Sequence, residues 1–263
     1  MSTFSTCTSS TRPGSPTDGD VLFETDTKNV IIWDGTNWRG YTNDGISFGA
    51  NAYSLDFDGT DDNITLGSNI SISGAFSISM WVRPDSLLGK YLGDTATDST
   101  FVYVNGSGNI TFRGGSGFTT SVGGGSTSWT NTAANLITGS WQHIVITRDT
   151  GLGYTLWRNN TSFTTTGASL TDSDISFNQI GEILSYPYGV YNGKFDDLAF
   201  YNKELSSSEV SSIYNNNLHT SGLVALYKFD EGSGSTLVDS VGSNDGTLNN
   251  FPASPWSSTD KPY

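Results

Sequence analysis

Cysteine and histidine are scarce in this sequence. Cys7 is the only cysteine, so no disulfide can form within the chain and its stability must come from packing, while an intermolecular bridge stays open. The two histidines, His143 and His219, have no second histidine near them in the sequence. That leaves almost no material for a zinc site or a nucleophilic triad. His143 falls in a strand pattern, where we expect a structural role.

Basic charge is also in short supply. The chain carries 12 Lys and Arg against 26 Asp and Glu, which gives a formal net charge of −14 at pH 7. A surface that tracks phosphates needs clustered positive charge, so we expect no nucleic-acid partner. Of the acids, 21 are Asp and 5 are Glu. This skew favours turns and oxygen-rich cation sites, and ordinary turn carboxylates account for most of it.

Long apolar runs are missing as well. Nowhere do roughly 18 apolar residues follow one another, and the opening MSTFSTCTSSTRPGSP lacks a basic region followed by an apolar stretch. We therefore expect no membrane insertion and no export by the usual signal-peptide route.

Residues that form strands and turns are abundant. Aromatic residues make up 13% of the chain and charged residues 14%, and 31 residues are glycine, which predicts an all-β fold of short strands joined by turns. From about residue 46 apolar side chains alternate with period two, so each strand buries one face against a second sheet. The alternation is clearest at 53–57, 76–82, 144–146, 154–156 and 223–229.

Two segments depart from this alternation. Residues 204–217 favour a short helix, because Ser206 and Glu209 have capping-box spacing ahead of a helical apolar stripe. Residues 114–128 are rich in Gly, Ser and Thr, which indicates a long exposed loop or a weak edge strand.

The N-terminal region, residues 1–45, differs from the rest. Residues 1–17 are polar and predict an extended arm, whereas residues 21–41 contain three apolar patches separated by turn signals and predict a small β meander. A meander of this size is too small to be stable alone, so it must dock on its own domain or on a neighbouring subunit.

Four phrases of the remaining region, residues 46–263, resemble the concanavalin A-like, laminin G-like family. They are YSLDFDGTDDNITL (53–66), FSISMWVRP (76–84), SWQHIVITRD (140–149) and the stretch 177–214 from FNQIG to SSIY. The resemblance implies a jelly-roll sandwich of two antiparallel sheets. A further phrase, LVALYKFDEGSGSTLVDS, resembles one that opens such domains but begins here at Leu223. We expect its strand, 223–229, to complete the same sandwich, since a second domain cannot fit behind it.

The N-terminal region resembles a segment near the start of bacteriophage tail-fibre and other virion proteins. The matching residues are Arg12, Pro13, Pro16, Gly19, Asp20, Trp33, Asp34, Gly35 and Trp38. The resemblance implies an attachment role, which we assign to Arg12, Pro13, Trp33 and Trp38.

The resemblance to laminin G-like domains also implies a Ca²⁺ site, because Ca²⁺ takes about 6–8 oxygen ligands and the family often holds one beside this Asp-Gly turn. Carried onto this sequence, the ligands are Asp58, the Gly59 carbonyl and Asp196, with Asp230 or Asp239 as additions. The residues themselves make the cluster Asp58, Asp61 and Asp62 and the pair Asp196-Asp197 the best metal candidates, since carboxylate and turn-carbonyl oxygens are the ligands of Ca²⁺. Ordinary hydrogen-bonded turn carboxylates are the alternative.

Related sandwiches include glycoside hydrolases, which need two carboxylates flanking the scissile bond. Glu24-Thr25-Asp26 begins the Glu-x-Asp-x-x-Glu pattern of the glucanases but lacks the final Glu and lies in the N-terminal region. We therefore expect no enzymatic activity.

Aromatic side chains beside polar loops are the usual basis of glycan binding. Trp129, Tyr186, Tyr188, Tyr191 and Asn192 border loops and are the surface candidates, whereas Trp81, Trp141 and Trp157 fall within strand patterns typical of the core.

Together these features favour a non-enzymatic virion protein, a capsid decoration or a tail fibre, made in the host cytoplasm and displaying a lectin-like module. Its expected partners are other virion proteins and cell-surface glycans, and many copies or a homo-oligomer would add avidity. A bacterial carbohydrate-binding lectin is the alternative, and a glycoside hydrolase is the third hypothesis.

Overall fold

A computed structural model describes residues 5–17, 19–25, 30–33, 35–41, 51–94, 100–113, 128–131, 135–151, 153–164, 174–181 and 189–263. The chain forms two compact units. One comprises Met1–Ala50 and Ser211–Ser221, and the other Asn51–Val210 and Gly222–Tyr263.

The N-terminal strands form a four-stranded sheet in the order β1 (Ser5–Cys7), β2 (Val21–Glu24), β3 (Val30–Trp33) and β4 (Trp38–Tyr41). The apolar patches at 21–41 thus form the expected meander. The tip of its second hairpin brings Trp33 opposite Trp38, with their rings edge to face at 5.6 Å.

The expectation of an extended arm over residues 1–17 needs a correction, because β1 pairs parallel with β2. Backbone hydrogen bonds form this ladder without any apolar side chain, so composition gave no sign of it. Arg12 forms an ion pair with Glu24, which is 1% exposed, while Pro13 is exposed. In the described part of the N-terminal unit, three of the four predicted attachment residues contact other residues of the same chain: Arg12, Trp33 and Trp38.

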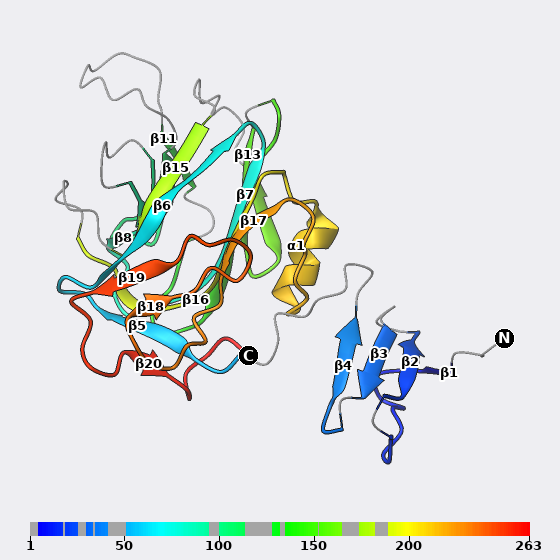
Figure 1. Cartoon of the computed structure of the whole chain (residues 1–263). Helices are drawn as coiled ribbons and strands as arrows, with labels where there is room; N and C mark the ends of the chain where they lie inside the picture. The colour runs from blue at the N-terminus through cyan, green and yellow to red at the C-terminus, as the bar shows by residue number, and fades with distance from the viewer. Residues whose placement is uncertain are drawn as a thin grey trace. The chain divides into compact units, whose positions relative to one another are not determined.

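The larger unit consists of two sheets that pack face to face (Figure 1). The first, which we call the β6 sheet, has eight strands in the order β11 (Ser128–Asn131), β10 (Ile110–Arg113), β9 (Phe101–Val104), β8 (Gly89–Gly93), β15 (Asp174–Ile180), β6 (Asn63–Ser73), β19 (Gly246–Asn249) and β18 (Thr236–Leu237).

The second, which we call the β7 sheet, also has eight strands. Seven follow the order β14 (Thr161–Thr164), β13 (Tyr154–Arg158), β12 (Gln142–Arg148), β7 (Phe76–Pro84), β16 (Asn192–Tyr201), β5 (Ser54–Asp58) and β20 (Trp256–Ser257), and β17 (Leu223–Tyr227) pairs with β16. The pairings between these strands are antiparallel, which confirms the all-β sandwich.

The core lies between the two sheets and follows the period-two pattern. On β7, Phe76, Ile78, Met80 and Val82 are 0–1% exposed and face the core. The alternate residues of the strand, Ser77, Ser79, Trp81 and Arg83, therefore lie on the opposite face of the β7 sheet. We call this the outer face.

A single helix, α1 (Ser207–Tyr214), occurs in the described residues. Ser206 and Glu209 form the predicted capping box, since the Ser206 amide donates to Glu209 Oε2 at 2.7 Å and the Glu209 amide donates to Ser206 Oγ at 3.4 Å. No helix in the described ranges is long and apolar enough to span a membrane.

Candidate functional site

Four adjacent strands of the β7 sheet place polar and aromatic side chains in one row across its outer face. Lys194 on β16 lies opposite Arg83 on β7 and opposite Asp56 on β5. Gln142 lies opposite Val82, so Trp141, the residue before β12, continues the row beside Arg83. We call Trp141, Arg83, Lys194 and Asp56 the outer row.

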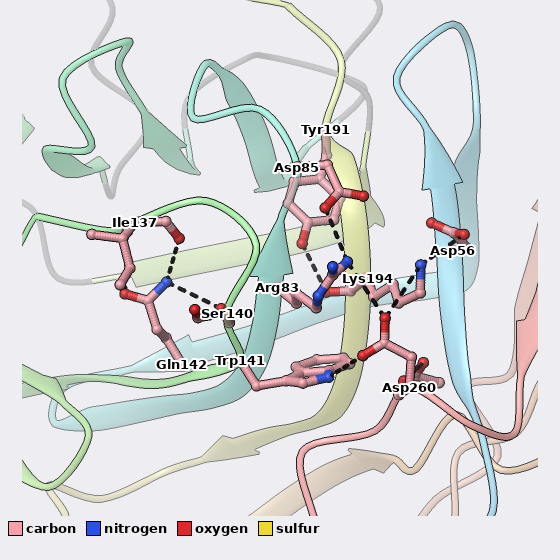
Figure 2. A network of polar contacts seen from close by, with 11 residues as sticks. Asp56, Arg83, Asp85, Ile137, Ser140, Trp141, Gln142, Tyr191, Lys194 and Asp260 are labelled. Carbon is pink, nitrogen blue, oxygen red and sulfur yellow. Dashed lines mark hydrogen bonds and ion pairs between the residues drawn. The ribbon is translucent and has the colours of Figure 1, made fainter.

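The two cations of the outer row each have an acidic partner, as Figure 2 shows. Arg83 Nη1 lies 2.9 Å from Asp85 Oδ1, and Lys194 Nζ lies 2.8 Å from Asp56 Oδ2. The exposed fractions are 24% for the Arg83 side chain and 11% for that of Lys194. The pairs hold both cations in fixed positions while a part of each stays open to solvent.

A third carboxylate, that of Asp260, contacts three of the four residues of the outer row. Its Oδ1 accepts a hydrogen bond of 2.9 Å from Trp141 Nε1, and its Oδ2 lies 3.4 Å from Arg83 Nη1 and 3.8 Å from Lys194 Nζ (Figure 2). An indole N–H, a guanidinium and an ammonium therefore converge on one anionic group. These three groups donate hydrogen bonds and accept none, so together they form a carboxylate-binding arrangement.

The loop before Trp141 is held by Gln142. Its Nε2 donates to the Ile137 carbonyl at 2.7 Å and its Oε1 accepts from the Ile137 amide at 3.3 Å. Because Gln142 is 2% exposed, this pair of hydrogen bonds is shielded from water and fixes the position of the neighbouring Trp141.

A second row, His143, Trp81 and Asp196, lies behind the first on the same face. Residues 258–263, which we call the covering segment, lie against it: Tyr263 contacts the Trp81 ring edge to face at 6.0 Å, and its hydroxyl donates to Asp197 Oδ2.

Burial lowers the pKa of His143 to about 3, so its imidazole is neutral at pH 7.

Asp196 and Asp197 are buried where the register between β16 and β7 shifts. Burial raises the pKa of Asp196 well above its usual value, and the neighbouring Asp197 raises it further. Burial also raises the pKa of Asp197 to about 7, against the hydrogen bond from Tyr263, which lowers it. Both carboxyl groups therefore hold a proton more tightly than exposed ones do.

A separate acidic turn follows β5. Asp58, Asp61 and Asp62 each place a carboxylate oxygen within 4.8 Å of the others. Asp62 is 0% exposed, and its Oδ2 accepts from the Asp58 amide at 2.8 Å while its Oδ1 has no hydrogen-bond partner among the described residues. A buried oxygen of this kind is costly without a partner, and a hard cation would satisfy it.

The predicted metal ligands do not all come together. Asp58 lies opposite Asn192, four residues from Asp196 along β16, or about 13 Å at roughly 3.3 Å per residue. Asp230 Oδ1 instead accepts from the amides of Ala52 and Tyr53 at 2.6 and 3.0 Å. Asp196 and Asp230 are therefore not ligands of the same cation as Asp58, whereas the predicted cluster of Asp58, Asp61 and Asp62 does lie together beside Gly59.

The predicted sugar-binding aromatics also need a correction. Tyr191 is 0% exposed, because its ring packs against Phe57 and Phe195 and its hydroxyl donates to the Lys194 carbonyl at 2.7 Å. It is a core residue rather than a surface one. Asn192, which is partly exposed, contacts the Gly59 turn. Trp129 lies on β11 opposite Phe112, and Tyr186 and Tyr188 lie outside the described residues.

The outer row was not predicted from the sequence. Trp141 sits at a strand end and fits the core pattern by sequence, and Arg83 and Lys194 lie more than 100 residues apart in the chain. Alternation shows which face a residue occupies, but no local pattern tells which strands are neighbours.

Comparison with known proteins supports this fold. Residues 58–211, more than half of the chain, match a laminin G-type family model described as the Concanavalin A-like lectin/glucanases superfamily. The search of curated proteins found no match.

Two solved structures share the arrangement. A "putative carbohydrate binding protein" from Bacteroides ovatus superposes with a TM-score of 0.56 at 17% identity, over 88% of this chain and 66% of that one. A heptameric SAP-like pentraxin from Limulus polyphemus gives a TM-score of 0.56 at 13% identity, over 79% of this chain and 95% of the pentraxin. The chain thus spans just under two thirds of the Bacteroides protein.

Proposed function

Because the chain belongs to the concanavalin A-like lectin/glucanases superfamily, we propose that it is a non-enzymatic glycan-binding module carried on a bacteriophage particle. The outer row carries the proposal. A sugar ring packs its apolar face on an aromatic side chain and hydrogen-bonds its hydroxyls to fixed polar groups. Trp141 supplies the aromatic surface, and the paired charges of Arg83 and Lys194 supply the polar groups.

A Ca²⁺ ion at the acidic turn is part of the proposal. Asp58, Asp61 and Asp62 would hold it together with the Gly59 carbonyl, and the unpartnered buried oxygen of Asp62 supports the fit. The ion would supply positive charge that offsets the repulsion among the three carboxylates. These residues would fix the turn next to Asn192, the first residue of β16.

This cation site gives a direct prediction. Adding about 1 mM Ca²⁺ should raise the melting temperature, since an ion present at about 100 times its Kd stabilises the fold by about 2.7 kcal/mol. Asp62→Asn should remove the shift, whereas Asp149→Asn, at a turn between other strands, should keep it. Differential scanning calorimetry with and without a chelator measures both. An equal shift in the two variants would exclude this site.

The virion assignment rests on the N-terminal resemblance at Arg12, Pro13, Trp33 and Trp38. The separate four-stranded N-terminal unit supports it, because an attachment element is expected to be distinct from the module that it carries. On this proposal the protein is made in the host cytoplasm, assembles with capsid or tail proteins in many copies, and contacts cell-surface glycans. A bacterial lectin with the same binding face is the second candidate.

The binding function is tested by glycan-array and calorimetric titration of the intact chain. Trp141→Ala should weaken glycan affinity about tenfold or more, equivalent to about 1.4 kcal/mol. Trp157→Ala, on the same sheet but outside the outer row, should leave affinity unchanged. Retained affinity in the Trp141 variant would exclude the outer row, and release of reducing ends from the bound glycan would show an enzyme instead.

A further inference from the structure

The covering segment, residues 258–263, lies on the same face as the outer row. Besides the Asp260 carboxylate, it makes polar and aromatic contacts: the Asp260 carbonyl accepts from Ser54 Oγ at 2.7 Å, Lys261 Nζ donates to the Asn51 carbonyl, and Tyr263 contacts Trp81 and Asp197. Each contact falls on an element of the β7 sheet or on the residues that lead into β5. The segment therefore occupies the face on which a glycan would bind.

The covering segment is held differently from the strand before it. β20, Trp256–Ser257, pairs with β5, and the Trp256 ring packs on the core. Residues 258–263, all of them described, form no regular strand, and Tyr263 remains 39% exposed. Polar contacts and the edge-to-face contact with Trp81, which lies outside the core cluster, hold this segment, so it can leave the sheet without disturbing the core.

The group that the segment places on the outer row is a carboxylate. Trp141 Nε1 lies 2.9 Å from one oxygen of Asp260, and the Arg83 and Lys194 cations lie 3.4 and 3.8 Å from the other. Arg83 and Lys194 also pair with Asp85 and Asp56, yet both lie within 4 Å of the same Asp260 oxygen. A neutral hydroxyl could accept from the indole but would gain no charge attraction from either cation. A ligand that displaces Asp260 matches this arrangement best when it brings its own carboxylate.

We propose that the covering segment is an intramolecular competitor for the glycan site, and that the site takes an acidic sugar whose carboxylate replaces that of Asp260. This inference rests on the proposed glycan-binding function and adds to it the ligand class and the regulation. Release of the segment also uncovers Trp81 behind the outer row, which provides a second aromatic ring for a longer glycan.

The test compares the intact chain with Asp260→Asn by calorimetric titration of trigalacturonic acid and of its methyl ester. Asparagine keeps the size of the side chain but removes the charge that Arg83 and Lys194 attract. The variant should bind the acid about tenfold more tightly than the intact chain, and the ester should bind weakly to both. Asp149→Asn changes the net charge equally at a distant turn and should bind the acid as the intact chain does.

A second arm tests the competition directly. A chain that ends at Ser257 should bind the peptide STDKPY in trans, and trigalacturonic acid should displace it, whereas STNKPY should not bind. If the truncated chain fails to fold, the Asp260→Asn titration decides alone.

The outcomes separate the two proposals. Equal acid affinity in the intact chain and Asp260→Asn, with loss of affinity in Trp141→Ala, would overturn the competitor and leave glycan binding in place. Equal affinity for acid and ester would overturn the ligand class. Absence of glycan binding in every variant would overturn both proposals.

Discussion

The side chain of Asp197 is buried, and its backbone adopts a conformation that few residues adopt. It is 5% exposed, its φ is 43°, and its Oδ2 accepts a hydrogen bond from Tyr263. Asparagine tolerates this left-handed region and can accept the same bond. Asp197→Asn is therefore a substitution that removes the titratable proton and leaves the local structure in place.

This residue predicts a pH dependence of stability. In the unfolded chain Asp ionises near pH 4, whereas burial raises the pKa of Asp197 to about 7 in the fold. Between these values the folded state retains a proton that the unfolded state has lost, so stability falls as pH rises, by up to about 1.4 kcal/mol per pH unit for one proton. Asp196 acts in the same direction.

Urea unfolding between pH 4 and pH 7 measures this slope, and Asp197→Asn should flatten it. An unchanged slope in the variant would show that Asp197 ionises in the fold as it does in the unfolded chain.

Gly193 precedes Lys194 of the outer row and has no room for a side chain. Its φ is 138°, and a Cβ there would lie 2.3 Å from the Arg83 carbonyl oxygen. Gly193→Ala should therefore cost more than about 2 kcal/mol of unfolding free energy, because the β7 and β16 backbones would have to separate.

Gly106→Ala is the matched control for this substitution, since a Cβ there meets nothing within 4 Å. Its effect should stay within about 0.5 kcal/mol. Chemical denaturation compares the two, and a similar small loss in both would contradict the close approach of the strands at Gly193.

At the scale of single elements, the sequence predicted what local chemistry determines. The strands at 76–82, 144–146 and 154–156 and the helix after Ser206 all form, because alternation and capping depend on neighbouring residues alone. The strand expected over 223–229 ends at Tyr227. Phe229 has a φ of 57°, a turn conformation that an apolar side chain does not predict.

The features that could not be predicted from the sequence are those set by which strands pair with one another. β1 and the outer row both result from pairing between distant segments. The Asp58 turn was recognisable as a possible cation site because Asp58, Asp61 and Asp62 are close in sequence. The link to Asp196 failed because the register of β16 on β5 separates them.

The helix cap gives a prediction for one element. Ser206→Ala removes the hydroxyl that accepts from the Glu209 amide, and it should cost about 1 kcal/mol. Ser207→Ala, at the exposed first residue of α1, should cost little, since alanine favours helix. Thermal unfolding of the two variants tests this. Equal destabilisation would mean that the capping box contributes nothing.

At the scale of the whole molecule, we expect the N-terminal unit and the sandwich unit to have different functions. On the proposed virion role, deleting residues 1–45 should abolish incorporation into phage particles and leave a folded sandwich, because the core of the sandwich draws on residues from Leu55 onward. Particle co-purification and circular dichroism measure the two effects. Particles that still carried the shortened protein would exclude the N-terminal region as the attachment element.

The pairing of β5 with β20 brings the two ends of the sandwich unit together, and Lys261 reaches across to the Asn51 carbonyl. A module whose entry and exit lie side by side can be spliced into a surface loop of another protein, or reconnected and opened elsewhere, with little strain on its core. The sandwich is therefore suited to circular permutation: a short Gly-Ser linker joining its ends, with a new opening between the exposed Gly106 and Ser107, should yield the same fold.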